Sequence, residues 1–543
     1  MAGVVGALCI LGNQAAAQPG ATADPASWRG DLALIAKEVP ARHPDAFYRM
    51  SRSSWDSAVK ALDARLPSLN RSQAVVALMQ VVAMVKDGHT SINPLYDPAL
   101  RVRYYPVELH LFDDGLFVKS ASPAYAALAG SKVLRIGNTS AADALTLAAS
   151  TLGHENDWWA RAWAPGRLEM VEILEGLGIV RDGASLPLEV EKDGTRRTVT
   201  LTPAGMITPA GHAGAPAIDR RGWIDMRTGA TTPLWQKRPG YPYWSEYQPH
   251  DKTLYVAYRA VISMDSPTNQ QFWSSVFAEV DSLQPERVVL DLRENTGGNS
   301  FHNRQVVRGI VARPAIDRRD RLFVITGPRT FSAAMNLALD LESWTNATFV
   351  GEPTGNATVF FGDHTQVRLP ASGITVNVST LPWYPDDPRD RRNFIAPGLY
   401  APMTSSDYKT GTDPVMRVIA AAGSSPDLAA EIEAAVARSD SAGAMAVIAR
   451  ARDAVVNRFN SPEAQINTLG YRLLASDKKK AIAVFTLNTR AFPNSANTWD
   501  SLGEALIADG QREDGIAAYR KALQLNPAYS SAIDALRRLG VSG

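Results

Sequence analysis

The chain has little cysteine, little net charge and no long apolar run outside its first residues. Its one cysteine, Cys9, can form neither an internal disulfide nor a cysteine-based metal site. Lys and Arg number 56 against 55 Asp and Glu, so the net charge is +1. This balance gives no reason to expect binding to nucleic acid or to an anionic membrane surface. Apart from the N-terminal segment, no apolar stretch approaches the roughly 18 residues that cross a bilayer, so we expect no membrane span in the mature chain.

The first 17 residues have the character of a targeting segment. Residues 1–11 are small and apolar, and Ala15-Ala16-Ala17 resembles the A-x-A site at which signal peptides are cleaved. The usual positive start is missing, which we interpret as a truncated signal peptide. The sequence therefore predicts a periplasmic or secreted protein whose mature chain lacks cysteine, which is compatible with an oxidising compartment.

The strongest chemical signal lies around Ser332. Four apolar residues, 322–325, predict a buried strand, Gly327 and Pro328 end it, and an apolar helical pattern begins at Ala333. Ser332 would then lie beside free backbone N–H groups and the positive end of a helix dipole. A serine nucleophile needs such donors because its attack generates an oxyanion. The alternative is that Ser332 merely caps the helix.

Two further motifs flank this turn. Residues 287–299 predict a buried strand that runs into the pair Gly297-Gly298, where backbone can approach a ligand and direct N–H groups at it. Residues 349–355 read F-V-G-E-P-T-G. The order D-L-R-E-N-T-G-G, T-F-S-A-A and V-G-E-P-T-G resembles the C-terminal processing (tail-specific) serine peptidases, over about residues 28–419. The resemblance implies that Ser332 is the nucleophile. It also implies that the N–H of Ala333 and those of Gly297 or Gly298 form the oxyanion hole.

The general base is less direct to assign. Many members of that family pair the serine with a lysine, but no lysine occurs here between Ser332 and Lys409. Histidine is then the default base at neutral pH. His89 follows a helical run in the motif D-G-H-T, which resembles the tricorn-like and retinoid-binding-protein-like branch, where the catalytic histidine precedes a PDZ-like domain. His364, in G-D-H-T, is the rival because it lies in the same region as Ser332, and His302 could line the site.

A histidine base usually needs an acceptor on its second ring nitrogen. Asp390, within the Asp- and Arg-rich segment 385–392, best matches the D-R-R element of the same branch. Its other interpretation is a solvated loop in which the carboxylates pair with their own arginines. Asp87 is a further candidate for this acid, although its position is equally consistent with a turn.

The 543 residues predict three to four domains, given roughly 100–200 residues per domain. We expect a multidomain α/β protein, because strands and helices alternate in its central region. The predicted layout is a signal peptide (1–17), an N-terminal helical domain ending in D-G-H-T (28–98), a PDZ-like β-rich domain (101–203), an aromatic and Pro-rich connector (204–250), a peptidase core (251–421) and tetratricopeptide-like repeats (426–543).

The repeats are predicted from spacing. Trp499, Leu502, Gly503, Leu506, Tyr519, Ala522 and Pro527 follow the tetratricopeptide pattern, and a weaker copy starts at Leu469-Gly470. A groove for a protein partner could lie there. PDZ-like domains bind extended peptides by strand addition. The predicted domain at residues 101–203 could bind a peptide in this way, or serve equally well as a structural spacer.

Together these features predict an exported serine peptidase with a Ser332–His89–acid mechanism, acting on a peptide or protein substrate. No metal or organic cofactor is implied, because the sequence offers neither metal-ligand motifs nor a phosphate loop. Two alternatives stay open. One is a scaffold on the same fold that binds a ligand or partner without catalysis, and the other is an esterase-like hydrolase using the same acyl transfer.

Overall fold

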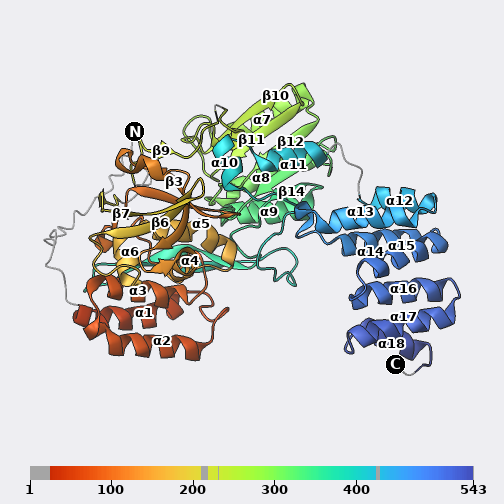
Figure 1. Ribbon diagram of the computed structural model, residues 1–543, viewed down its shortest axis with the longest axis horizontal. Helices are drawn as coiled ribbons and strands as arrows, with labels where there is room; N and C mark the ends of the chain where they lie inside the picture. The colour runs from red at the N-terminus through yellow and green to blue at the C-terminus, as the bar shows by residue number, and fades with distance from the viewer. Residues whose placement is uncertain (1–24, 209–217, 230, 423–427, 542–543) are drawn as a thin grey trace, which may run out of the picture.

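The fold consists of four bodies along the chain, which the computed structural model describes over residues 25–208, 218–229, 231–422 and 428–541 (Figure 1). The predicted signal peptide and Cys9 lie outside these residues. Within the described ranges, no helix combines the length and the apolar character needed to cross a membrane. The multidomain α/β class predicted from the sequence is confirmed.

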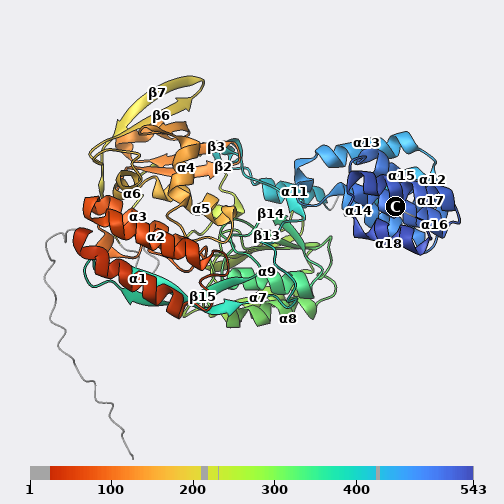
Figure 2. The same ribbon diagram turned by 90° about the horizontal axis from the view of Figure 1, so that it is seen from below.

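The helical body contains three helices with their apolar sides turned inward: α1 (Arg29–Arg42), α2 (Arg52–Arg65) and α3 (Arg71–Ala83). An Asn70–Gln73 capping box starts α3, which is mostly buried. This body is not self-contained. The hairpin of β15 (Phe360–Arg368) and β16 (Thr375–Trp383) crosses from the core and places Val367, Val376 and Val378 in the same apolar cluster. Figure 2 shows this hairpin beside α1.

The second body is a seven-stranded sheet, which we call the sheet body. Two turn residues with positive φ, Asp193 and Gly194, close its last hairpin. Its strands are β2 (Val107–Phe112), β3 (Gly115–Ala121), β4 (Lys132–Ile136), β5 (Thr139–Ser140), β6 (Leu186–Lys192), β7 (Thr195–Leu201) and β9 (Ile224–Asp225). Its helices are α4 (Ala141–Ala149), α5 (Asp157–Arg167) and α6 (Val171–Gly176), and a separate pair joins β1 (Arg103–Tyr104) to β8 (Gly205–Met206).

The core is a six-stranded sheet in the order β10-β11-β12-β13-β14-β17, parallel except for β10. Its strands are β10 (Tyr243–Gln248), β11 (Thr253–Tyr258), β12 (Arg287–Asp291), β13 (Leu322–Thr326), β14 (Thr348–Gly351) and β17 (Leu399–Tyr400). The predicted connector is therefore not a separate unit: β9 joins the sheet body and β10 joins the core, since each supplies a strand with backbone partners.

Helices cover both faces of the core sheet. Alternate strand residues such as Val256 and Leu290 pack under α7 (Asn269–Leu283), α8 (Asn303–Val311) and α9 (Ala333–Trp344). The other set, including Val289 and Phe323, packs under α11 (Pro414–Ala422), which follows the short α10 (Ser405–Thr410). Burial on both faces explains the continuous apolar runs of β12 and β13. Because the strands are parallel, their carboxyl ends meet at one edge, and the three motifs follow those ends.

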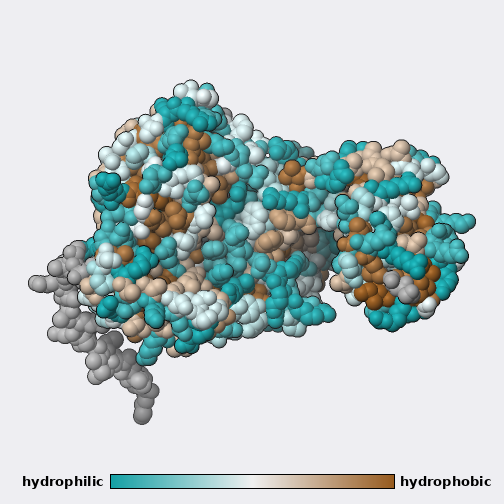
Figure 3. All heavy atoms as spheres, turned by 60° about the horizontal axis from the view of Figure 1, so that its bottom comes forward, coloured by the Kyte–Doolittle hydropathy of each residue, from teal (hydrophilic) through white to brown (hydrophobic). Residues whose placement is uncertain are grey.

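The repeat body, at the right of Figure 1, is a row of antiparallel helices. They are α12 (Leu428–Ala437), α13 (Ser441–Asp453), α14 (Pro462–Leu474), α15 (Lys478–Ala491), α16 (Ala496–Ala508), α17 (Arg512–Leu525) and α18 (Ser530–Arg538). The small residues of the predicted pattern lie at close approaches: a Cβ on Gly470 would come within 2.4 Å of Phe485, and one on Gly503 within 3.0 Å of Tyr519. Hydrophobic and hydrophilic surface alternate over this body, as Figure 3 shows at the right.

An aromatic joint of Trp158, Phe394, Tyr400 and Phe459 connects the repeat body to the rest. The Phe459 ring meets the Tyr400 ring edge-on at 5.2 Å between centroids, and the Trp158 and Phe394 rings at 6.2 and 6.0 Å. The Arg458 guanidinium lies 5.2 Å from the centre of the Tyr400 ring and 5.4 Å from that of Phe459. Edge-to-face pairs of this kind add about 0.5–1.5 kcal/mol to the burial of the rings.

Replacing Phe459 with Ala should loosen the repeat body without unfolding it. The joint would lose about 1–3 kcal/mol, from one aromatic side chain and its ring contacts. We expect limited proteolysis to release the repeat body about tenfold faster or more, since about 1.4 kcal/mol corresponds to a factor of ten. Val455→Ala is the control, because Val455 is 63% exposed on the same segment. Equal release rates for the two variants would show that the joint does not hold the bodies together.

Candidate active site

Ser332 occupies the junction that the sequence predicts, between β13 and α9, but it does not cap the helix. Its side chain makes no capping hydrogen bond, and its backbone is held at φ 56° and ψ −126°. A positive φ is rare and costly for a residue other than glycine. The capping interpretation is therefore wrong. The half-buried Ser332 hydroxyl is free of the helix end, in a turn whose conformation the surrounding structure must impose.

The Gly297-Gly298 turn lies directly against Ser332. A Cβ on Gly297 would come within 2.6 Å of the Ser332 Cβ and 3.0 Å of the Ala333 nitrogen. The two loops are also bonded to each other, because the Phe331 N–H donates to the Asn295 carbonyl at 3.1 Å. These contacts bring the strand end of β12 and the start of α9 into one site, as the resemblance implies.

The two glycines differ as oxyanion donors. The Gly297 N–H donates to Asn295 Oδ1 at 2.9 Å, so it is occupied. The N–H groups of Gly298 and Ala333 have no acceptor among the described residues. Of the alternatives that the sequence leaves open, this geometry favours Gly298 over Gly297. The left-handed φ of 138° at Gly298 and its close approach to the Val261 carbonyl exclude a side chain there.

The D-G-H-T loop is fixed by a buried carboxylate. Asp87 is 1% exposed, and its Oδ1 accepts the His89 backbone N–H at 3.0 Å. Its Oδ2 accepts hydrogen bonds from Thr90 Oγ1 at 2.6 Å, Ser379 Oγ at 2.5 Å and His43 Nε2 at 3.1 Å. Burial acts to raise the pKa of Asp87, but the His43 hydrogen bond, the nearby His89 ring and Ser379 hold it below its ordinary value.

His43, which donates a hydrogen bond to Asp87 from the helical body, has a defined tautomer. The Asp45 N–H donates to His43 Nδ1 at 3.1 Å, so Nδ1 is the unprotonated nitrogen and Nε2 carries the proton that reaches Asp87. Three separate segments therefore meet at one carboxylate: the end of α1, the D-G-H-T loop and strand β16. The position of His89 depends on all three.

His89 lies beside the serine turn. Its ring stacks on Phe331, the residue before Ser332, with 4.5 Å between centroids, and Phe331 stacks in turn on Trp159 at 3.9 Å. His89 Nδ1 is buried without a hydrogen-bond partner in the described part of the chain, and Asp87 Oδ1 lies 3.9 Å away. Burial lowers the pKa of His89, although the charge of Asp87 opposes this. A neutral imidazole next to the serine turn is in the protonation state that a base requires.

No hydrogen bond joins either rival residue to Ser332 among the described residues, although the charge of His364 acts to lower the pKa of His89. Asp390 accepts hydrogen bonds from Thr358 Oγ1 at 3.1 Å and from the Arg392 guanidinium, which also pairs with Glu342. No contact joins Asp390 to His89 among the described residues, and Asp87 is the carboxylate next to the ring. His364 is exposed on β15. The structure thus brings Ser332, Gly298, Ala333, His89 and Asp87 together, and leaves Asp390 in the ion pairs of its own loop.

The sequence interpretation missed two buried polar residues next to Ser332. Asn356 is fully buried and accepts the Ser332 N–H on Oδ1 at 2.5 Å, while its Nδ2 donates to Glu155 Oε1 at 3.0 Å. Burial, with the charge of Asp87 added, raises the pKa of Glu155 to about 8. The signal was faint: Glu155 belongs to a short polar segment, G-H-E-N, between two helices of the sheet body.

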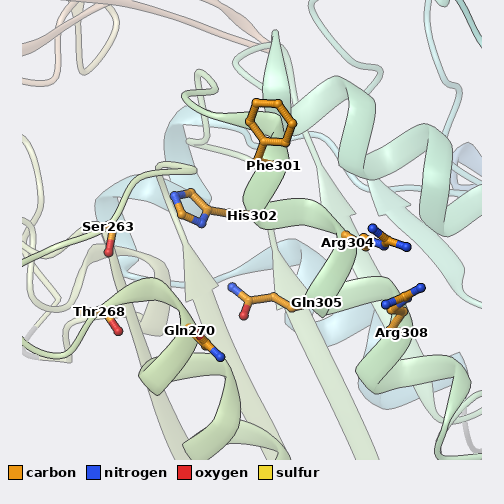
Figure 4. A pocket seen from close by; sticks show the side chains of 8 residues that line it. All are labelled: Ser263, Thr268, Gln270, Phe301, His302, Arg304, Gln305 and Arg308. Atoms are coloured by element: carbon orange, nitrogen blue, oxygen red, sulfur yellow. The ribbon is translucent and has the colours of Figure 1, made fainter.

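A hollow of about 480 Å³ opens beside the glycine turn, between the start of α7 and the start of α8 (Figure 4). Ser263, Thr268 and Gln270 line one side, and Phe301, His302, Arg304, Gln305 and Arg308 line the other. Phe301 is 91% exposed. The Arg304 and Arg308 guanidiniums pair with no carboxylate among the described residues. His302 lies on the wall of this hollow, whose lining does not include Ser332 or His89.

Comparison with known protein sequences gives only a partial match. No protein-family model matches the chain. A curated relative, the β-barrel assembly-enhancing protease of Yersinia pestis, is 32% identical over 91 residues, which are 17% of this chain and 19% of that protein. The chain therefore matches about a fifth of that relative's length.

Solved structures give a broader likeness. Mature CPAF complexed with lactacystin aligns over 74% of this chain and 98% of its own, with 12% identity and a TM-score of 0.52. Mature CPAF alone gives 12% identity, 74% and 97% coverage and a TM-score of 0.51. The photosystem II D1 C-terminal processing protease covers 71% and 98% at 17% identity, with a TM-score of 0.32. At these identities, the likeness to mature CPAF shows that this chain shares its fold.

Proposed function

We propose that this protein is an exported serine peptidase that hydrolyses peptide bonds through an acyl-enzyme. The observation that carries the proposal is that Gly298 and Ala333, in the two loops packed together at Ser332, have N–H groups with no acceptor in the described part of the chain, while the Ser332 hydroxyl does not cap its helix. Preorganised donors of this kind can bind the oxyanion that forms in acyl transfer. The peptidase character of the fold neighbours supports the same conclusion.

In this mechanism Ser332 Oγ attacks the substrate carbonyl while His89 accepts the hydroxyl proton. The new Oγ–C bond places negative charge on the carbonyl oxygen, which the Gly298 and Ala333 N–H groups bind. When the C–N bond breaks, the protonated His89 delivers its proton to the departing amine. Water then attacks the acyl-enzyme by the reverse use of the same groups and releases the carboxyl product.

The acid behind His89 is proposed to be Asp87, with Asp390 as the candidate that the sequence favoured. Asp87 lies 3.9 Å from His89 Nδ1, close enough to stabilise an imidazolium and to form a direct hydrogen bond after a small ring movement. Asp390 instead forms an ion pair with Arg392 and accepts a hydrogen bond from Thr358. Export is proposed from the signal-like segment 1–17, and a protein partner for the repeat body from its tetratricopeptide-like pattern.

The role of Ser332 is tested with a serine-reactive phosphonate. We expect the wild-type protein to be labelled once and Ser332→Ala not to be labelled. The kcat for peptide hydrolysis should fall by about 10⁶-fold in Ser332→Ala, the effect of removing the nucleophile in a comparable peptidase. Ser140→Ala is the matched control, because Ser140 caps α4 through the Asp143 N–H and should leave labelling unchanged. An unlabelled wild-type protein would favour the scaffold alternative.

The base is tested by the pH dependence of kcat/KM. His89 must be neutral to accept a proton, so activity should fall as the pH drops through its pKa. Because burial lowers that pKa, the midpoint should lie below the ordinary value of about 6.5. His89→Ala should remove most activity, whereas His364→Ala, which changes an exposed histidine on the hairpin, should change it little. The reverse pattern would assign the base to His364.

A further inference from the structure

We propose that Glu155 is a positioning residue for the nucleophile: through Asn356 it fixes the backbone of Ser332 in its strained turn. This inference rests on the proposed function of Ser332 and assigns a role to two residues that the mechanism does not use. Glu155 belongs to the sheet body, Asn356 to the loop after β14, and Ser332 to the start of α9.

The relay has a defined hydrogen-bond direction. Asn356 Oδ1 accepts the Ser332 N–H at 2.5 Å, so its amide nitrogen must face the other way, where it donates to Glu155 Oε1 at 3.0 Å. Oε1 serves as the acceptor whether Glu155 is ionised or carries its proton on Oε2. In a flipped orientation the Asn356 NH₂ would face the Ser332 N–H, donor against donor. Glu155 therefore stabilises the orientation that holds the serine.

The surrounding loops leave this relay little freedom. Gly355, next to Asn356, donates to the Thr330 carbonyl at 3.0 Å, and a Cβ there would come within 2.3 Å of the Pro328 carbonyl oxygen. On the other side, Asn156 Nδ2 donates to the Thr354 and Asn393 carbonyls at 3.2 and 2.6 Å. Both ends of the relay are thus tied to the same loop, and Ser332 is held at φ 56° between them.

Glu155 is buried in a setting that disfavours its charge. It is 8% exposed, and its second oxygen, Oε2, has no hydrogen-bond partner among the described residues. The charged groups that act on it are Asp87, which disfavours ionisation, and Arg49, which favours it. His43 and His89 face Asp87 rather than Glu155. With a pKa of about 8, Glu155 is neutral at pH 7, and ionisation would place a second buried negative charge beside Asp87.

A double-mutant cycle in the full-length protein tests the relay. Glu155→Leu removes the acceptor for the Asn356 amide and should lower kcat and the phosphonate labelling rate about 100-fold, the scale expected for a misplaced reacting group. Glu155→Gln is the conservative control, because a glutamine keeps an acceptor oxygen and should retain most activity at neutral pH. In an Asn356→Ala background the relay is already broken, so adding Glu155→Leu should cost nothing more. Equal losses from Glu155→Leu in both backgrounds would overturn the proposal.

Hydrogen exchange at the Ser332 amide gives a readout that does not depend on activity. The N–H should be protected in the wild type and in Glu155→Gln, and exchange faster in Glu155→Leu and Asn356→Ala. If wild-type protein is not labelled by the phosphonate, the proposed function fails, while this exchange pattern still decides the relay. If labelling succeeds and exchange is the same in all variants, the function stands and the relay is wrong.

The pH profile separates a positioning role from a purely structural one. As the pH rises through about 8, Glu155 should ionise and be repelled by Asp87, which should loosen the Ser332 turn and lower kcat. Glu155→Gln should remove this alkaline decline. Glu352→Gln is the matched control, because burial also raises the pKa of Glu352, to about 7, and no hydrogen bond joins Glu352 to Ser332 in the described part of the chain. An alkaline decline that persists in Glu155→Gln would contradict the role assigned to Glu155.

The same ionisation has a signature in stability. A carboxyl whose folded-state pKa is raised keeps its proton while the unfolded chain loses it. The contribution of Glu155 to the folded-to-unfolded ratio should therefore fall about tenfold (about 1.4 kcal/mol) per pH unit between roughly pH 4.5 and 8, and stop falling above that. Glu155→Gln should flatten this slope in denaturant titrations followed across that range. A slope unchanged by Glu155→Gln would place the ionisation elsewhere.

Discussion

The burial of one carboxylate, Asp87, is the constraint on which the rest of the site depends. An ionised carboxylate away from water is costly unless each oxygen receives hydrogen bonds. Asp87 receives them from its own loop, from His43 at the end of α1 and from Ser379 on β16. Satisfying this charge therefore requires the helical body and the core hairpin to be in place at once. The position of the His89 ring is a consequence of that requirement.

The two neighbouring buried acids, Asp87 and Glu155, differ in protonation state. Asp87 has several donors and keeps its charge, whereas Glu155 has an unpartnered oxygen and keeps its proton. The difference in their surroundings separates their pKa values, as in other sites where paired carboxyl groups take different roles. A neutral acid can orient an amide without adding repulsion. Under the proposed function, Asp87 thus places a negative charge near His89, where an imidazolium would form, and the neutral Glu155 adds none beside Asn356.

Much of the fold and half of the site could be read from the sequence. The strand-to-helix turn at Ser332 and the hairpin at Asp193-Gly194 are local, because apolar runs and glycines determine them within a few residues. The choice of Gly298 over Gly297 was not readable, because it depends on where the Asn295 side chain turns. Glu155 and Asn356 were not readable either. Asn356 directly follows the V-G-E-P-T-G motif, but its meeting with Glu155 joins residues 201 positions apart, which spacing along the chain does not predict. The hairpin over α1 was missed for the same reason.

The segment from Glu155 to Trp159 contacts both the core and the repeat body. Glu155 reaches the serine loop, Trp159 stacks on Phe331, and Trp158 belongs to the joint with the repeat body. Under the proposed function, a chain of which only the first half has been synthesised and folded contains the base, His89, without the nucleophile. An isolated core contains the nucleophile, Ser332, without the base. Hydrolytic capacity then arises only when the last fold contacts close. Until the bodies dock, the two groups stay apart and the proposed acyl transfer has no site.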